Sequence, residues 1–141
     1  MKNLVIFASG SGSNAENIIR YFAQKPEFCI KKIYCNVPDA YVLERAKKYG
    51  VPAQVFNREE FRNPEKILHH LQEEATDFII LAGFLWLMPP CITAAYPYRI
   101  INIHPALLPA YGGKGMYGHH VHEAVIAARE QESGITIHYV N

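Results

Sequence analysis

Apolar residues occur in two alternating patterns along this chain. Strand-like apolar runs predict strands at residues 4–8, 30–35, 53–56, 78–82, 100–103 and 135–140. The first of these runs is continuous, as expected for a strand covered on both faces of a sheet. Apolar residues at helical spacing predict helices over residues 14–24, 40–49 and 121–129, and two more that begin at Asn63–Pro64 and Pro89–Pro90. The alternation predicts an α/β protein with a mostly parallel sheet, in a Rossmann-like three-layer sandwich.

Length and charge narrow the range of partners. The 141 residues suffice for one globular domain, and no linker or repeat divides them, so we expect a single domain over residues 1–141. The formal net charge is +1, and the largest basic blocks are the pairs Lys31–Lys32 and Lys47–Lys48. This charge pattern argues against a nucleic acid or a membrane as partner, so we expect small-molecule substrates.

Cysteine and histidine usage bears on compartment and metal content. The three cysteines are odd in number and lie in or beside apolar segments, which is typical of buried thiols in a reducing compartment, so we expect a cytoplasmic protein. The first apolar run is too short for a signal peptide or a membrane span. His119, His120 and His122 have no accompanying cysteine or carboxylate at ligand spacing, so we expect no metal site.

The sequence Ser-Gly-Ser-Gly-Ser-Asn at residues 9–14 stands between the first predicted strand and the first predicted helix. Free backbone N–H groups and the positive end of the helix dipole favour an anion at such a junction. The glycines permit close approach of the backbone, and Ser11, Ser13 and Asn14 offer further hydrogen bonds. We therefore expect a phosphate site here. The alternative is a turn that only caps the helix.

Residues 10–15 also fit the Gly-x-Gly-x-x-Ala form of the dinucleotide fingerprint. That fingerprint requires an acidic residue at the end of the second strand to hold a ribose. Here Cys35–Asn36 occupies that place, with Asp39 slightly beyond it. A lone phosphate is therefore favoured over a dinucleotide.

Asn102 and His104 alternate at the end of an apolar strand, so we expect their side chains on one face. This strand end should lie at the same sheet edge as the glycine loop. An Asn amide beside a His that is cationic near neutral pH can stabilise a developing oxyanion, which suggests acyl transfer. Without further context, a structural hydrogen-bonding role for His104 is equally open.

The run Asn-Ile-His-Pro-Ala-Leu-Leu-Pro at residues 102–109 closely resembles the signature of the formyltetrahydrofolate-using transferases. Together with the loop at residues 9–14 and Leu-Ala-Gly-Phe at residues 81–84, it makes the whole chain similar to the glycinamide ribonucleotide transformylases (phosphoribosylglycinamide formyltransferases). The resemblance implies the formyltransferase fold and transfer of a formyl group from 10-formyltetrahydrofolate, a cosubstrate, to the amine of glycinamide ribonucleotide in purine biosynthesis.

The resemblance also implies roles for individual residues. His104 and Asn102 are the implied catalytic residues, and Asn102 also contacts folate. The implied ligands of the ribonucleotide phosphate are Gly12, Ser13 and Asn14. The pteridine of folate is expected against Leu85, Trp86, Leu87 and Met88, although many members carry an Arg at the position of Trp86.

The last predicted strand has no closing helix after it, so we expect the C-terminal part of the domain beyond Asn141. The family's third catalytic residue, an Asp, is expected there too. The glycine-rich segment at residues 111–118 is a candidate lid. Alternatives are the catalytic core of methionyl-tRNA formyltransferase or of formyltetrahydrofolate deformylase, and an inactive phosphate-binding module. We expect a monomer or a homodimer.

Overall fold

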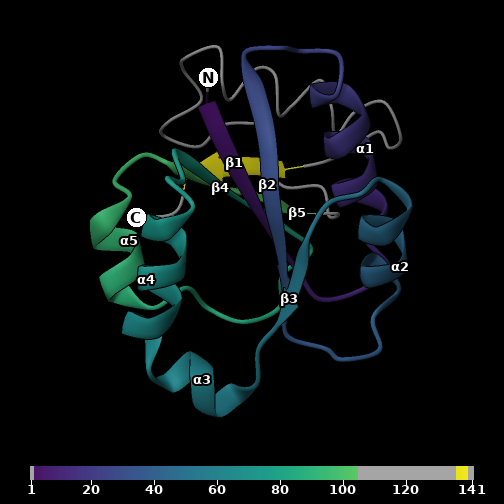
Figure 1. The fold of residues 1–141 in the computed structure, drawn as a ribbon. Coiled ribbons are helices and arrows are strands. Elements are labelled where there is room, and N and C mark those ends of the chain that lie inside the picture. Colours follow the sequence, from purple (N-terminus) through teal and green to yellow (C-terminus); the bar gives the residue numbers. More distant parts are fainter. Residues whose placement is uncertain (1, 105–135, 140–141) are drawn as a thin grey trace.

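The computed structural model describes residues 2–104 and 136–139, in which strands and helices alternate as predicted (Figure 1). The strands are β1 (Lys2–Ala8), β2 (Phe28–Cys35), β3 (Ala53–Val55), β4 (Phe78–Ala82), β5 (Ile100–His104) and β6 (Thr136–Tyr139). The helices are α1 (Ser13–Phe22), α2 (Tyr41–Lys48), α3 (Arg58–Arg62), α4 (Pro64–Glu73) and α5 (Pro90–Ala95). Each predicted strand is present to within two residues at either end. The predicted helix over residues 121–129 lies outside the described residues.

The strands form one sheet in the order β3-β2-β1-β4-β5-β6. All pairs from β3 to β5 are parallel, and β6 is antiparallel to β5. The prediction of a mostly parallel sheet is therefore confirmed. β1 lies in the interior, with β2 and β3 on one side and β4, β5 and β6 on the other.

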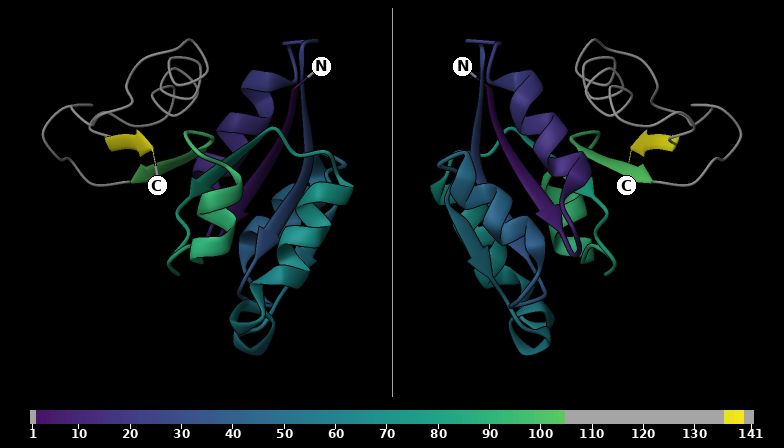
Figure 2. Two further views of the ribbon diagram at one scale, coloured as in Figure 1. Left: turned by 90° about the vertical axis from the view of Figure 1, so that its left-hand side faces the viewer. Right: turned by 90° about the vertical axis from the view of Figure 1, so that its right-hand side faces the viewer.

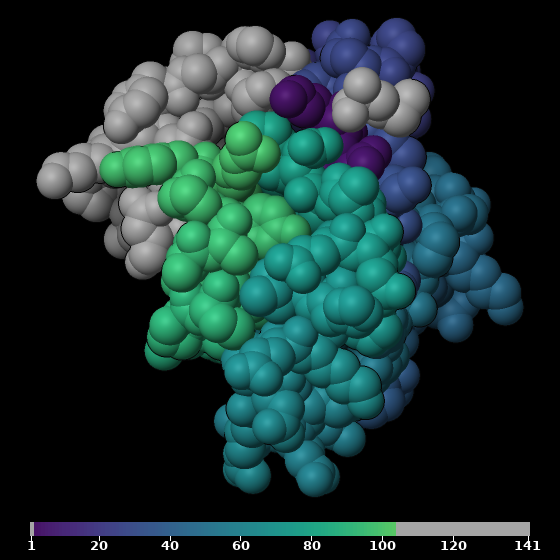
Figure 3. Space-filling model, turned by 60° about the vertical axis from the view of Figure 1, so that its left-hand side comes forward, coloured from purple at the N-terminus to yellow at the C-terminus, as the bar shows by residue number. Residues whose placement is uncertain are grey.

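Helices cover both faces of the sheet (Figures 1 and 2), so the predicted three-layer sandwich is also confirmed. Successive residues of β1 point to opposite faces. Leu4, Ile6 and Ala8 belong to the core between the sheet and helices α1 and α2, here named the α1–α2 core. Val5 and Phe7 belong to the core under α4 and α5, named the α4–α5 core. Figure 3 shows the second face, where the side chains of α3, α4 and α5 close over the sheet.

Helix α3 is an element that the hydrophobic pattern did not predict. Asn57 and Glu60 form a capping box at its start: the Asn57 side chain accepts from the Glu60 N–H at 2.8 Å, and the Glu60 carboxylate accepts from the Asn57 N–H at 3.0 Å. The next helix begins at Pro64 as predicted. However, Asn63 makes no side-chain capping bond there.

No helix in the described part of the chain is long and apolar enough to cross a bilayer.

Because β1 lies in the interior of the sheet, we expect a large loss of stability when one of its buried side chains is shortened. Ile6 is 0% exposed, so Ile6→Ala should lower the free energy of unfolding by about 2–5 kcal/mol, measured by urea denaturation. Leu87→Ala is the matched control because Leu87 is 91% exposed, and it should change stability by less than about 0.5 kcal/mol. Equal losses in the two variants would contradict this assignment of the core.

Candidate functional site

β1 and β4 are neighbours at the centre of the sheet, but the chain leaves them in opposite directions, toward β2 and toward β5. Such a switch point opens a crevice at the carboxyl edge of the strands, where ligands of open α/β sheets bind. Here the crevice is a cleft of about 140 Å³. Its lining comes from the loop after β1, residues 10–14, and from Ala82 and Gly83 at the end of β4. We call residues 10–14 the phosphate loop.

Gly12, Ser13 and Asn14, the predicted phosphate ligands, form the start of α1. Gly12 is the N-cap residue, with a φ of 81° that glycine adopts without strain. No side chain caps α1. The first N–H groups of the helix, at the positive end of its dipole, are therefore available to an anion in the cleft. Asn14 Oδ1 is buried without a hydrogen-bond partner, an acceptor that a ligand hydroxyl would satisfy. None of the described residues that line the cleft is Lys or Arg.

Helix α2 holds the phosphate loop in place. The Val42 N–H donates to the Gly10 carbonyl at 3.2 Å, and Arg45 Nε donates to the Ser11 carbonyl at 2.7 Å. Arg45 Nη1 is also 2.5 Å from a carboxylate oxygen of Glu16 on α1. The charge of Arg45 is therefore balanced within the protein, and its role is to tie the loop to two helices.

The end of β2 differs from that of a dinucleotide-binding protein, as predicted. Asn36 follows the strand, and its Oδ1 accepts a hydrogen bond from the Ser9 hydroxyl at 2.6 Å. Asp39 is exposed. The Asn36 side chain thus pairs with the protein itself at the place where a ribose-binding acid would stand.

The expectation of buried thiols is correct only for Cys35. Burial raises the pKa of the Cys35 thiol, which keeps it protonated and unreactive near neutral pH. Cys29 and Cys91 are half-buried, and all three cysteines are free thiols.

Residues 84–88 follow β4 and alternate between packed and exposed side chains. Phe84, Trp86 and Met88 pack against the α4–α5 core. Leu85 and Leu87 are 79% and 91% exposed. We call residues 85–88 the folate segment, after the predicted role. Its exposed leucines lie at the carboxyl edge of the sheet and offer apolar surface to a ligand.

Trp86 is fixed by aromatic and cationic neighbours. Its ring lies 5.3 Å from that of Phe61 and 5.9 Å from that of Phe56, centroid to centroid. The Arg58 guanidinium lies 4.5 Å from the centre of the Trp86 ring, within the range of a cation–π interaction. The half of the folate segment that faces the protein is therefore held by side-chain packing.

Asn102 lies on β5 beside Leu81 of β4. Its neighbours Ile101 and Ile103 belong to the α1–α2 core, so the alternation of the strand directs Asn102 to the opposite face, which also carries Trp86. Asn102 is half-buried. Asn102 and the folate segment thus share one face of the sheet, as the predicted folate contact requires.

His104 is the last residue of β5, and its backbone pairs with that of Thr136 on β6. Its side chain lies outside the described part of the structure, as do the candidate lid at residues 111–118 and His119, His120 and His122. The described residues contain no group of three or more His, Cys, Asp or Glu side chains that could hold a metal ion.

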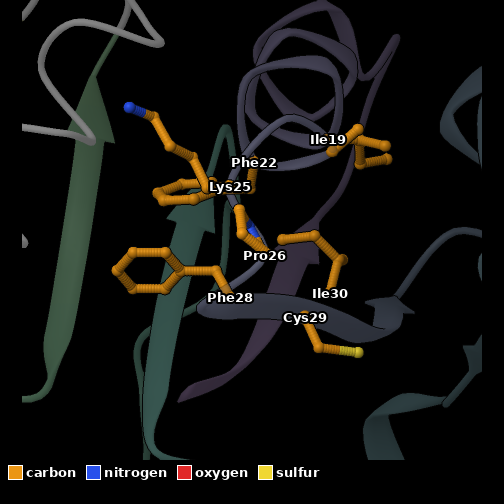
Figure 4. Close-up of a pocket in the computed structure, with 8 residues that line it drawn as sticks. Ile19, Phe22, Lys25, Pro26, Phe28, Cys29 and Ile30 are labelled. Carbon is orange, nitrogen blue, oxygen red and sulfur yellow. The ribbon is translucent and has the colours of Figure 1, made fainter. Parts of the chain in front are cut away.

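A second and larger hollow, of about 450 Å³, lies at the opposite end of the strands from the candidate site (Figure 4). It is formed by the end of α1, the following turn and the start of β2, with Phe22, Pro26 and Phe28 among its lining residues. Its lining is apolar apart from Lys25, and it carries none of the polar groups that fix the orientation of a substrate. The smaller cleft at the switch point is therefore the better candidate site.

Sequence reasoning missed three residues that organise the site. Ser9 and Asn36 were noted only as parts of loops, and Arg45 was not singled out. Their contacts join segments distant in sequence, so no local spacing indicated them. One signal was available for Ser9, since a polar residue at the end of an apolar strand is buried only when it is hydrogen-bonded.

The fold and the cleft define an α/β protein of Rossmann-like class that binds its ligands at the carboxyl edge of a parallel sheet. Comparison with known families makes this specific. The profile of the formyl transferase family matches residues 2–141. The chain therefore belongs to the formyl transferase family.

Its relatives point to one branch of that family. The chain is 39% identical to the chloroplastic phosphoribosylglycinamide formyltransferase of Arabidopsis thaliana, and the match covers 99% of the chain and 50% of the relative. It is 38% identical to the phosphoribosylglycinamide formyltransferase of Haemophilus influenzae, over 100% of the chain and 66% of the relative. The chain thus spans half to two thirds of the length of these curated relatives.

A solved structure agrees with these matches. Glycinamide ribonucleotide transformylase 1 from Geobacillus kaustophilus superposes with a TM-score of 0.76 at 36% identity, over 100% of this chain and 75% of the other. The formyltransferase fold predicted from the sequence is confirmed.

The close contact between Gly12 and α2 predicts that the phosphate loop does not accept a side chain. A Cβ atom on Gly12 would lie 2.5 Å from Val42 Cγ2 and 2.8 Å from Val42 Cα, and the residue has a positive φ. Gly12→Ala should therefore displace the loop and weaken the binding of inorganic phosphate about tenfold or more, measured by calorimetric titration.

Gly50→Ala is the matched control for this experiment, because Gly50 has a similar positive φ of 69° but does not line the cleft. A Cβ atom on Gly50 meets nothing within 4 Å, so phosphate binding should change by less than about twofold. An unchanged dissociation constant in Gly12→Ala would show that the loop does not bind phosphate.

Proposed function

We propose that this chain carries the site at which a formyl group passes from 10-formyltetrahydrofolate to the amine of glycinamide ribonucleotide. The observation that carries the proposal is the meeting of three loops at one edge of the sheet: the phosphate loop after β1, the folate segment after β4, and the end of β5 with Asn102. Family membership supports the reaction class. The names of the relatives support the choice of substrate.

The two substrates would occupy opposite sides of the sheet edge. The ribonucleotide phosphate would bind the N–H groups at the start of α1, on the side of the α1–α2 core. The flat pteridine of folate would lie on the folate segment, against the exposed Leu85 and Leu87. The formyl carbon and the amine would then meet between the loops, near Asn102.

The transfer itself is a direct displacement at the formyl carbon. The amine nitrogen attacks this carbon to form a tetrahedral intermediate, and the bond to N10 of folate then breaks. Asn102 donates its amide N–H to the formyl oxygen, and the His104 imidazolium stabilises the negative charge that develops there. The same imidazolium gives its proton to N10 as it leaves, and the neutral imidazole that results takes up the proton that the amine loses, directly or through water.

Several finer features of the proposal follow the sequence predictions. Gly12, Ser13 and Asn14 remain the proposed phosphate ligands, and residues 85–88 the proposed folate contacts. A cytoplasmic location and a monomer or homodimer remain predictions. The Arabidopsis relative is named as chloroplastic, so location differs among proteins of this kind.

The catalytic assignment predicts a severe loss of activity in His104→Ala. In the protein at its natural length, turnover of formyl transfer should fall by about a hundredfold or more, because charge stabilisation needed mainly in the transition state is removed. Phosphate binding and thermal stability should be nearly unchanged. Rates are measured by following the absorbance of the folate product.

His69→Ala is the control for His104→Ala, because His69 lies on α4 with 70% of its side chain exposed, and it should transfer formyl groups at the unaltered rate. Transfer at the unaltered rate in His104→Ala would contradict the assignment. The histidine would then be structural, and an inactive phosphate-binding module would be favoured.

The end of β2 predicts that NAD and NADP do not bind. Asn36, which follows β2 where a ribose-binding acid would stand, is engaged with Ser9. The next acidic residue in the sequence, Asp39, is exposed. Titration with NAD up to millimolar concentration should give no saturable signal, while inorganic phosphate does. Micromolar affinity for NAD would favour a dehydrogenase over a transferase.

A further inference from the structure

The buried hydroxyl of Ser9 lies where the two halves of the proposed site meet. Ser9 is the first residue after β1 and directly precedes the phosphate loop, and only 4% of it is exposed. Its Oγ donates to Asn36 Oδ1 at 2.6 Å and accepts from the backbone N–H of Leu85 at 2.9 Å. One hydroxyl therefore joins the ends of β1 and β2 to the first residue of the folate segment.

These two bonds use the hydroxyl in a defined way. Because the one O–H hydrogen is given to Asn36, a lone pair of the oxygen is left for Leu85. Hydrogen bonds in such a chain polarise and strengthen one another. The orientation of Asn36 thus sets the direction in which Ser9 accepts the N–H of Leu85.

Leu85 depends on this bond more than its neighbours do. Phe84 and Trp86 pack against the α4–α5 core, whereas the side chain of Leu85 is largely exposed. The hydrogen bond from its backbone N–H to Ser9 therefore holds its backbone in place. Gly83, two residues earlier, has a φ of 70° and also lines the cleft beside the phosphate loop.

The phosphate loop, in contrast, has supports that do not involve Ser9. Val42 and Arg45 of α2 hold the carbonyls of Gly10 and Ser11. Loss of the Ser9 hydroxyl should therefore release the folate segment while leaving the phosphate loop in its present shape.

We propose that Ser9 is a positioning residue for the folate site: its hydroxyl, oriented by Asn36, holds the backbone of Leu85 and with it the folate segment. The inference rests on the proposed function for the identity of the two ligands. Its distinctive consequence is an unequal effect on the two substrates, which a general loss of stability would not produce.

Ser9→Ala tests the proposal by a comparison of two Michaelis constants in the protein at its natural length. The KM for 10-formyltetrahydrofolate should rise on the order of tenfold, because the Leu85 N–H loses the partner that holds the folate segment in place. The KM for glycinamide ribonucleotide should change by less than about twofold, because α2 still holds the loop.

Trp86, the one tryptophan of the sequence, gives a second measurement that needs no turnover. It lies next to Leu85 in the folate segment, so its fluorescence reports on that segment. Ser9→Ala should shift the Trp86 emission of the unliganded protein and increase its quenching by acrylamide, while the affinity for inorganic phosphate, measured by calorimetry, stays unchanged.

Two further variants separate positioning from general damage. Thr76→Val removes another buried hydroxyl, at 9% exposure, from the turn before β4 at the opposite edge of the sheet. This variant should alter neither of the two KM values nor the Trp86 emission. Asn36→Ala removes the acceptor for Ser9, and its effect on the folate KM should be less than additive with that of Ser9→Ala.

The outcomes distinguish this inference from the proposed function. If the unaltered protein transfers no formyl group, the proposed function fails, and the Trp86 emission of Ser9→Ala still tests the positioning role. If transfer occurs but Ser9→Ala raises both KM values equally, or neither, Ser9 has no positioning role. Trp86 emission and quenching that are unchanged in Ser9→Ala would also overturn the inference.

Discussion

The parallel pairing of β1 with β4 is the constraint on which the candidate site depends. Parallel strands bring their carboxyl ends to one edge, and the chain leaves these two strands in opposite directions. The loops that follow therefore diverge and leave a cleft between them. Gly10, Gly12 and Gly83 have no side chains, so the backbone itself forms part of both walls of this cleft. Its main-chain groups are therefore available to a ligand.

Backbone geometry, more than charge, prepares the phosphate loop for an anion. Arg45 contacts the loop through the Ser11 carbonyl, and its charge is neutralised by Glu16. Among the described residues that line the cleft there is no Lys or Arg, so this part of the chain presents N–H groups to an anion without a free cation beside them. Such a site would bind a phosphate through directed N–H hydrogen bonds and the helix dipole. Its affinity would depend on ionic strength less than the affinity of a lysine-lined site does.

Much of the fold could be predicted because most strands contain an apolar run and most of the loops that follow contain glycine or proline. β4, for instance, was predicted to the residue, since all five of its side chains are buried. α3 was missed because it has no buried residue, and only its Asn57–Glu60 capping box marked it. Ser9, Asn36 and Arg45 could not be identified from spacing, because each acts through a contact across at least 27 residues that exists only after the sheet has formed.

The two faces of the sheet divide the proposed substrates between them, and this division has a consequence for the chemistry. The phosphate loop is tied to α2 on the side of the α1–α2 core, whereas Trp86 and Asn102 lie on the side of the α4–α5 core. Neither substrate alone would span the edge, so the reacting atoms come together only when both sides are occupied. A direct transfer without a covalent enzyme intermediate suits this arrangement, because the sheet edge itself brings the formyl carbon to the amine.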